Sequence, residues 1–223
     1  MVKLRNPEFR PEGTSRRSRS VQRILNAAAS IFGGEGFEKA SMLAVAKAAG
    51  VSKGLLHYHF RSKDHLLIET QRAIFKQIHL RFEERFNRGD QGMDTALDAL
   101  DALWESMLDM RPWAPFMVET MSLATQQNPI REHLDNFYGE AEQLLEKSIK
   151  KAFADDIDRL TVPPRRLTQL IRTCFLGLLV ELAQAHTPSE IQVIDDTYYD
   201  FRKLFAQIAL VPVQQNPEPE NSR

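Results

Sequence analysis

Residues 41–63, SMLAVAKAAGVSKGLLHYHFRSK, hold two short helical patterns separated by a sharp break. The first, residues 42–49, is rich in alanine, and Gly50 is expected to end it because glycine accepts the left-handed conformation that closes a helix. Ser52 can then accept a hydrogen bond from a free N–H group at the start of a second helix, residues 53–60. A supporting helix, a tight turn and a second short helix together predict a helix-turn-helix.

The two faces of the second helix differ in character. Leu56 and Phe60 are four residues apart, so they share one face and can fix it to the core. The opposite face carries hydrogen-bond donors and flat rings, from Lys53, Leu55, His57, Tyr58 and His59. Val51, in the turn, is expected to be buried. The inward face of the first helix is expected to hold Leu43, Val45, Ala46 and Ala49.

This stretch resembles the DNA-binding domain of the TetR family of bacterial transcriptional regulators. The resemblance covers residues 18–67: it begins with VQRILNAAASIF and GGEGF, continues through S-x-x-x-V-A-x-x-A-G-V-S-K-G-x-L and ends in H-F-R-S-K-D-x-L-L. The rest of the chain is similar to the family only in length and helical character. The resemblance implies an all-α fold, in which a three-helix DNA-binding domain precedes a larger helical domain for ligand binding and dimerisation.

Several matched positions imply contacts with the DNA backbone. Ser41 stands where the family usually has a Thr or Ser that bonds a phosphate. His59 and Lys63 stand at positions that commonly meet the backbone. The chain departs from the family at His57, where a phosphate-binding tyrosine is usual, but an imidazole can also donate to a phosphate oxygen.

Other matched positions imply contacts with base edges in the major groove, the only groove wide enough for a helix. These are Lys53, Leu55 and Tyr58. With them, the expected DNA-binding set is Ser41, Lys53, Gly54, Leu55, His57, Tyr58, His59 and Lys63. The alternative is that Tyr58 and the two lysines are ordinary surface residues. A metal site is not expected, because histidines two residues apart on a helix point to different sides.

Charge is divided unevenly along the chain. The net charge is −1, but residues 1–63 hold 12 Lys and Arg against 4 Asp and Glu, and residues 64–223 hold 17 against 26. A basic N-terminal part suits a polyanionic partner, although chance clustering is the alternative. The single cysteine, Cys174, excludes an internal disulfide and suits a reducing compartment. No apolar run approaches about 18 residues and no signal peptide is visible, so we expect a cytoplasmic protein without a membrane partner.

Helical periodicity and punctuation predict four regions: a flexible basic arm (1–17), the helix-turn-helix domain (18–63), the helical ligand-binding and dimerisation domain (64–210) and a disordered tail (211–223). The first helix, 18–32, is expected to end at Gly33, Gly34 and Gly36. A long helix, 63–88, is expected to cross from the basic to the acidic half. Periodicity favours a helix at 93–110 and, after a break at Pro112 and Pro115, another at 116–125. Prolines that open helices favour further helices at 130–154, 165–186 and 189–210. No strand pattern is visible.

Two further sites are expected in the second domain. Large apolar residues that can line an adaptable pocket are Trp104, Met107, Phe116, Met117, Met121, Phe137 and Phe175. A dimer is expected because specific binding normally needs two reading helices one DNA turn apart. The candidate interface residues are Leu170, Cys174, Leu178, Leu182, Tyr198, Phe201 and Phe205, which could form a four-helix bundle with a second subunit. Both sets could instead be ordinary core.

These features together predict a homodimeric repressor that binds a pseudo-palindromic DNA operator and is released by an unidentified small molecule, with no cofactor. The acidic second half favours a cationic or neutral ligand. One alternative is a DNA-binding regulator without small-molecule control, acting constitutively or through a protein partner. A small helical enzyme is the other, but no Ser/His/Asp or Glu/His spacing provides a catalytic set.

Overall fold

The computed structural model describes residues 16–86 and 91–211. Within these residues the chain is all-α, as predicted, with one isolated antiparallel bridge between Leu160 and Leu210. The α-helices are α1 (Arg16–Glu35), α2 (Met42–Ala48), α3 (Lys53–His59), α4 (Lys63–Phe86), α5 (Met93–Asp109), α6 (Ala114–Ala124), α7 (Asn128–Ala152), α8 (Pro164–Gln184) and α9 (Pro188–Ile208). Two 3-10 helices, η1 (Arg111–Trp113) and η2 (Ala154–Arg159), precede α6 and follow α7.

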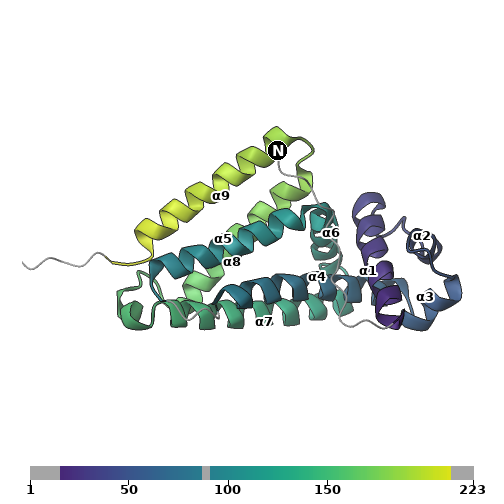
Figure 1. Cartoon of the computed structure of the whole chain (residues 1–223), viewed down its shortest axis with the longest axis horizontal. Helices are drawn as coiled ribbons and strands as arrows, with labels where there is room; N and C mark the ends of the chain where they lie inside the picture. The colour runs from purple at the N-terminus through teal and green to yellow at the C-terminus, as the bar shows by residue number, and fades with distance from the viewer. Residues whose placement is uncertain (1–15, 87–90, 212–223) are drawn as a thin grey trace, which may run out of the picture.

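The molecule has two parts (Figure 1). Helices α1, α2 and α3 gather at one end and form what we call the head. Helices α4 to α9 form the body. Helix α4 begins beside α1 and packs against α5 and α7 further along, so one continuous helix joins the two parts.

Hydrogen bonds and backbone angles show where the short helices of the head begin and end. The Ser41 Oγ accepts from the Ala44 N–H at 3.1 Å, and the Ser52 Oγ accepts from the Leu55 N–H at 3.1 Å. Between them Gly50 has a φ of +61°, which is the left-handed conformation expected at the break. The predicted Ser52 cap and the turn are therefore present, and Ser41 caps α2 in the same way.

The end of α1 differs from the prediction. Gly33 and Gly34 lie inside the helix, which continues to Glu35, and the break comes at Gly36 with a φ of +85°. Gly33 has a packing role instead, since a Cβ there would lie 3.3 Å from the Phe116 Cβ of α6. A glycine in this helix therefore allows the head and the body to approach closely.

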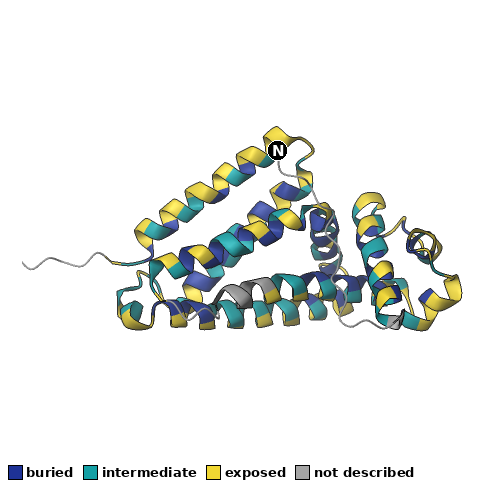
Figure 2. Ribbon diagram, in the orientation of Figure 1, coloured by how far each residue is buried: buried dark blue, intermediate teal, exposed yellow. Residues whose placement is uncertain are grey.

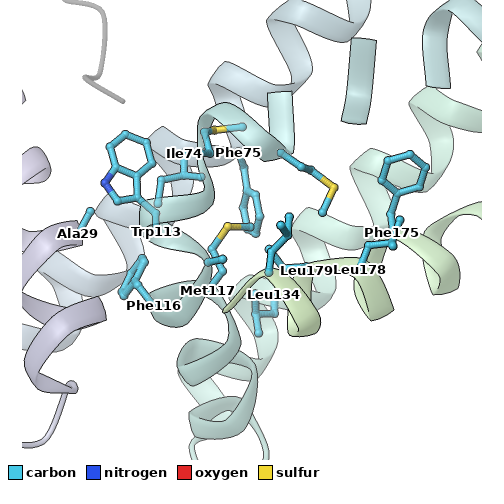
Figure 3. Packing of buried hydrophobic residues seen from close by; sticks show 14 of the residues in the cluster. Ala29, Ile74, Phe75, Trp113, Phe116, Met117, Leu134, Phe175, Leu178 and Leu179 are labelled. Carbon is cyan, nitrogen blue, oxygen red and sulfur yellow. The ribbon is translucent and has the colours of Figure 1, made fainter. Parts of the chain in front are cut away.

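The core is continuous from the head into the body. In Figure 3, Trp113 and Phe116 lie beside Ala29 of α1, while Met117 and Phe75 face the residues of α8. The Phe116 ring stacks on Phe32 of α1, with centroids 5.8 Å apart. Helix α6 thus contributes side chains to both parts of the core.

The helices of the body lie within two residues of their predicted bounds. Proline falls in the first turn of α7, α8 and α9, which confirms that these prolines open helices. Pro115, expected to break the chain before its helix, lies in the first turn of α6. Helix α1 already begins at Arg16, so the predicted arm loses its last two residues to the helix. The rest of the arm, the end of the 63–88 helix beyond residue 86 and the tail beyond residue 211 lie outside the described residues.

Helix α8 is the one described helix that could cross a membrane by length and composition alone. Arg172 and Glu181 interrupt its apolar sequence, in line with the expectation that no uninterrupted apolar run approaches about 18 residues. The core helices of soluble proteins meet the same criterion of length and composition, and α8 packs against α6, α7 and α9.

Candidate nucleic-acid interface and ligand cavity

Helix α3 is fixed to the head through two side chains. Leu56 is fully buried and Phe60 is 4% exposed, which confirms them as the anchors of this seven-residue helix. Val51, expected to be buried, is only half-buried, although it packs against the core. The side chain of Val51 is therefore less buried than the sequence suggested.

The opposite side of α3 faces outward. Lys53, Leu55 and His57 are exposed, as is Gly54, and Tyr58 is 70% exposed. His59 differs, because it is half-buried and its ring packs edge-on against Tyr58, with centroids 5.1 Å apart. One short helix therefore presents a cation, an aliphatic side chain, an imidazole and a phenol on a rigid base.

Helix α2 places two further side chains at the surface. Ser41 is exposed, and its hydroxyl, which accepts the capping bond, can still donate its own hydrogen. Leu43 was expected to point inward but is 63% exposed. The residues that face the core are instead Met42, Val45, Ala46 and Ala49, which have the i, i+3, i+4 and i+7 spacing of one helix face. Leu43 does not belong to this series. A helix of seven residues leaves little periodicity from which to choose the stripe.

Lys63 is bound inside the head. Its ammonium donates to the backbone carbonyls of Phe37, Glu38 and Ala40 at 2.8, 3.2 and 3.3 Å. It also lies 4.3 Å from the centroid of the Phe37 ring. Since an ammonium has three hydrogens to donate, these carbonyls account for its donor capacity. Lys63 therefore ties the start of α4 to the loop after α1.

The body contains a cavity of about 150 Å³ between α4, α5, α6, α7 and α8. Five of the predicted pocket residues line it, namely Met107, Met117, Met121, Phe137 and Phe175. Other apolar side chains complete the lining, among them Phe75, Ile78, Leu103 and Leu179. Its lining is almost entirely apolar.

The remaining two predicted pocket residues pack elsewhere. Trp104 stacks on Tyr198, with centroids 4.9 Å apart, and its indole N–H donates to Asp195 at 2.6 Å. It therefore joins α5 to α9. Phe116 is fully buried against α1. The sequence could not separate these residues from the lining, because large apolar residues recur on several faces of each helix.

A carboxylate joins the head and the body. The Glu119 Oε1 on α6 accepts from the Phe37 N–H at 2.6 Å, just after the break that ends α1. The neighbouring α6 residues Met117 and Met121 line the cavity, and Phe116 contacts α1. One helix of 11 residues therefore lines the cavity and also contacts α1 and the loop that follows it.

Four of the predicted dimer residues are buried inside the subunit: Leu178, Leu182, Tyr198 and Phe205. The Tyr198 hydroxyl donates to Asp101 at 2.6 Å, where Arg202 also binds. Burial and the Asp101 carboxylate raise the pKa of Tyr198, so it remains protonated. This internal network on α5 and α9 was not visible in the sequence, because it joins residues about a hundred positions apart.

The other three predicted dimer residues are accessible to different degrees: Cys174 and Phe201 are half-buried, and Leu170 is 53% exposed. Exposed apolar side chains continue along both helices, at Leu170 and Val180 of α8 and at Val193, Leu204 and Ile208 of α9. We call these five residues the outer apolar surface. Figure 2 shows the long exposed face of α9 that carries part of it.

No group of three or more His, Cys, Asp or Glu that could hold a metal ion occurs among residues 16–86 and 91–211. His65, close to the two histidines of α3, accepts from the Arg61 N–H through its Nδ1 at 3.2 Å. It therefore has a local structural role at the start of α4.

Known proteins resemble the chain most clearly in the head. Residues 24–70 match the family model described as bacterial regulatory proteins, tetR family. The transcriptional regulator UidR of Escherichia coli K12 is 42% identical over 71 residues, which are 32% of this chain and 34% of UidR. The repressor KstR2 of Mycolicibacterium smegmatis is 28% identical over 93 residues, 42% of each chain. The chain thus spans only about a third of the length of the first of these relatives.

Solved structures share the whole fold. A transcriptional regulator from Saccharomonospora viridis, solved in complex with choline, has a TM-score of 0.71 at 18% identity and covers 87% of this chain and 100% of its own. A TetR-family regulator from a Rhodococcus species has a TM-score of 0.69 at 21% identity, over 86% and 99% of the two chains. These likenesses show that the fold is shared, whereas the sequence similarity is concentrated near the N-terminal end of the chain. Over residues 24–70, therefore, the chain is similar to the bacterial regulatory proteins of the tetR family.

Proposed function

We propose that the chain is a sequence-specific DNA-binding regulator that acts as a homodimeric repressor and is released from DNA by a small molecule. The observation that carries this proposal is the exposed side of α3. Its seven residues rest on Leu56 and Phe60, and Lys53, Leu55, His57 and Tyr58 all face outward. A helix of this size, held rigidly at the surface, fits the major groove of B-DNA.

The exposed side chains fall into two chemical groups. Lys53 and His57 can donate to base acceptors or phosphate oxygens, and Ser41 can donate its hydroxyl hydrogen to a phosphate. Leu55, Tyr58 and the unexpectedly exposed Leu43 can pack on thymine methyl groups or sugars. Lys63 stabilises the head rather than contacting DNA, because its ammonium already donates to three backbone carbonyls of the head.

A second subunit is needed to bring two α3 helices to one operator. The outer apolar surface supports self-association through α8 and α9, because several exposed apolar side chains on two neighbouring helices are costly to leave in water. Gly177 lies on the same helix as Leu170 and Val180, and a Cβ there would meet no atom within 4 Å. The backbone of α8 is thus open to close approach by a partner helix.

Release by a ligand requires that the ligand bind one form of the protein better than the other. Helices α4 and α6 both line the cavity and both contact α1. A ligand that moves α6 also moves Glu119 and Phe116, and with them the loop and helix that support α3. Cavity occupancy and the spacing of the two α3 helices can therefore be coupled without a direct contact.

The first experiment measures DNA binding directly. A duplex bound by the full chain is selected from a random library, and its affinity is followed by fluorescence anisotropy from about 50 to 200 mM salt, across which phosphate contacts weaken strongly. We expect tight, salt-sensitive binding that Lys53→Ala weakens. The matched exposed lysine of the body, Lys147→Ala, leaves it unchanged. Failure to select any duplex, or equal losses in both variants, would contradict the proposal.

A further inference from the structure

Two polar groups at the cavity have no hydrogen-bond partner. The hydroxyl of Tyr138, on α7, is buried and makes no hydrogen bond, and the same is true of the Nε of Arg172, on α8. Both residues belong to the cavity lining. The Arg172 guanidinium carbon lies 5.8 Å from the centroid of the Tyr138 ring, so the two side chains are neighbours. A buried donor without a hydrogen-bond partner is costly, and a bound ligand is one way to complete it.

Both groups carry a hydrogen that they can donate. Burial raises the pKa of Tyr138 to about 12, so its hydroxyl keeps its hydrogen at neutral pH. The Nε of Arg172 lies 2.8 Å from the Glu142 Oε1, which makes an ion pair. Its N–H is not directed at that oxygen, however, and makes no hydrogen bond. Both groups can therefore donate, and the Arg172 charge is already neutralised by Glu142.

The rest of the lining defines the body of the ligand. Carbon atoms of aromatic, methionine and leucine side chains make up nearly all of it. An engineered cavity of about 150 Å³ lined by Leu, Ile and Phe binds benzene in another protein, so this volume suits a single ring or an aliphatic group of similar size.

The charged groups of the cavity lining disfavour both anionic and cationic ligands. An anionic ligand would meet the Glu142 carboxylate beside the same Arg172, and a buried anion without its own partner is costly. A cationic ligand would find the one carboxylate of the lining already paired. A neutral molecule has neither difficulty.

We propose that the cavity binds a small neutral molecule, with an apolar body about the size of one ring and one carbonyl oxygen that accepts from the Tyr138 hydroxyl and the Arg172 Nε. This rests on the proposed function only in taking the cavity as the effector site. It also narrows the cationic-or-neutral class expected from the sequence to neutral carbonyl compounds.

Calorimetry on the full chain tests the class with four ring probes: acetophenone, ethylbenzene, benzoate and benzyltrimethylammonium. Acetophenone and ethylbenzene have similar shapes and differ in the oxygen. We expect acetophenone to bind about tenfold more tightly than ethylbenzene, the effect of about one hydrogen bond, and more tightly than either ion. Tyr138→Phe removes most of that preference and leaves ethylbenzene binding unchanged, whereas Tyr199→Phe, an exposed phenol on α9, leaves the preference intact.

A second measurement needs no variant. The carbonyl stretch of bound acetophenone should move to lower frequency than in a hydrocarbon solvent, because hydrogen-bond donors weaken the C=O bond. Equal affinities for acetophenone and ethylbenzene, tighter binding of either ion, no binding of any probe, or an unshifted carbonyl band would each overturn the proposal. DNA binding by the ligand-free chain is measured separately, so failure here leaves the DNA-binding assignment untouched, and the reverse also holds.

Discussion

The head and the body of this molecule use their apolar residues differently. In the head, α3 has seven residues, of which Leu56 is buried and five are exposed on one outward surface, and the second anchor, Phe60, directly follows the helix. In the body, α8 has 21 residues whose apolar side chains serve the core, the cavity and the outer apolar surface. A short helix with one buried face leaves few possible roles for each residue, whereas a long helix with several apolar faces leaves many.

Charge follows the same division. The basic excess lies in residues 1–63 and the acidic excess in residues 64–223. An exposed surface that binds a polyanion gains from the first, and an apolar cavity gains little from the second. The predictions that follow test whether the two parts have separate tasks, and they run from the largest expected effect to the smallest.

The neighbours Leu55 and Leu56 test the division within α3. Leu56→Ala removes a fully buried side chain and should lower the free energy of unfolding by about 2–5 kcal/mol, with loss of DNA binding. Leu55→Ala, at a position that is 36% exposed, should leave stability nearly unchanged and still weaken DNA binding. Urea denaturation and anisotropy measure both quantities. Equal destabilisation by the two variants would show that α3 has no distinct outward face.

The outer apolar surface is tested by adding a charge. Leu204→Glu places a carboxylate where the proposed partner helix packs and should weaken the dimer by at least about tenfold, because burying an unpaired charge is costly. Leu80→Glu, at a leucine of α4 that is 47% exposed, is the control and should leave the assembly unchanged. Sedimentation velocity over a concentration series measures the change. A Leu204→Glu protein that stays dimeric would place the interface elsewhere.

Lys63 separates a structural cation from one that binds DNA. Lys63→Met removes the ammonium that holds three carbonyls of the head and should lower the free energy of unfolding by about 1–3 kcal/mol. The slope of log affinity against log salt should stay the same, since a lysine that meets a phosphate contributes about 0.9 to it. A smaller slope without loss of stability would assign Lys63 to the DNA backbone instead.

Glu119 tests the connection between the two parts. Glu119→Leu removes the acceptor of the Phe37 N–H and should speed hydrogen exchange at that amide, with a loss of stability of about 1 kcal/mol. DNA affinity without ligand should change little, because α3 and its anchors are untouched. Amide exchange followed by NMR measures the effect. Unchanged protection of Phe37 would mean that this hydrogen bond does not hold the loop.

The sequence predicted the head in more detail than the body, for physical reasons. Ser41, Gly50 and Ser52 act on backbone groups within four residues, so their roles are local and readable. Leu43 was misplaced because a seven-residue helix gives two nearly equal choices of inward stripe. The contacts of Lys63 were not visible in the sequence because its three partners lie more than twenty residues away in the chain.

In the body the sequence predicted helix bounds well, since proline and periodicity are local signals. Which apolar face meets the cavity depends on how the helices pack, and so Trp104 and Phe116 were grouped with Met117 although only Met117 lines it. The Tyr138 hydroxyl and the Arg172 Nε, which make no hydrogen bond, come from different helices and have no sequence signature. Long-range polar contacts of this kind require the structure.

The most direct test of the central claim is the effect of Tyr58→Ala on two affinities, one for the selected duplex and one for a random duplex of the same length. Because Tyr58 is 70% exposed on the outward side of α3, its removal should leave folding unchanged. We predict a loss of about tenfold or more on the selected duplex and little change on the random one, as expected for a side chain that contacts bases. Equal losses on both duplexes, or no loss on either, would contradict the assignment of this side of α3 to sequence-specific DNA recognition.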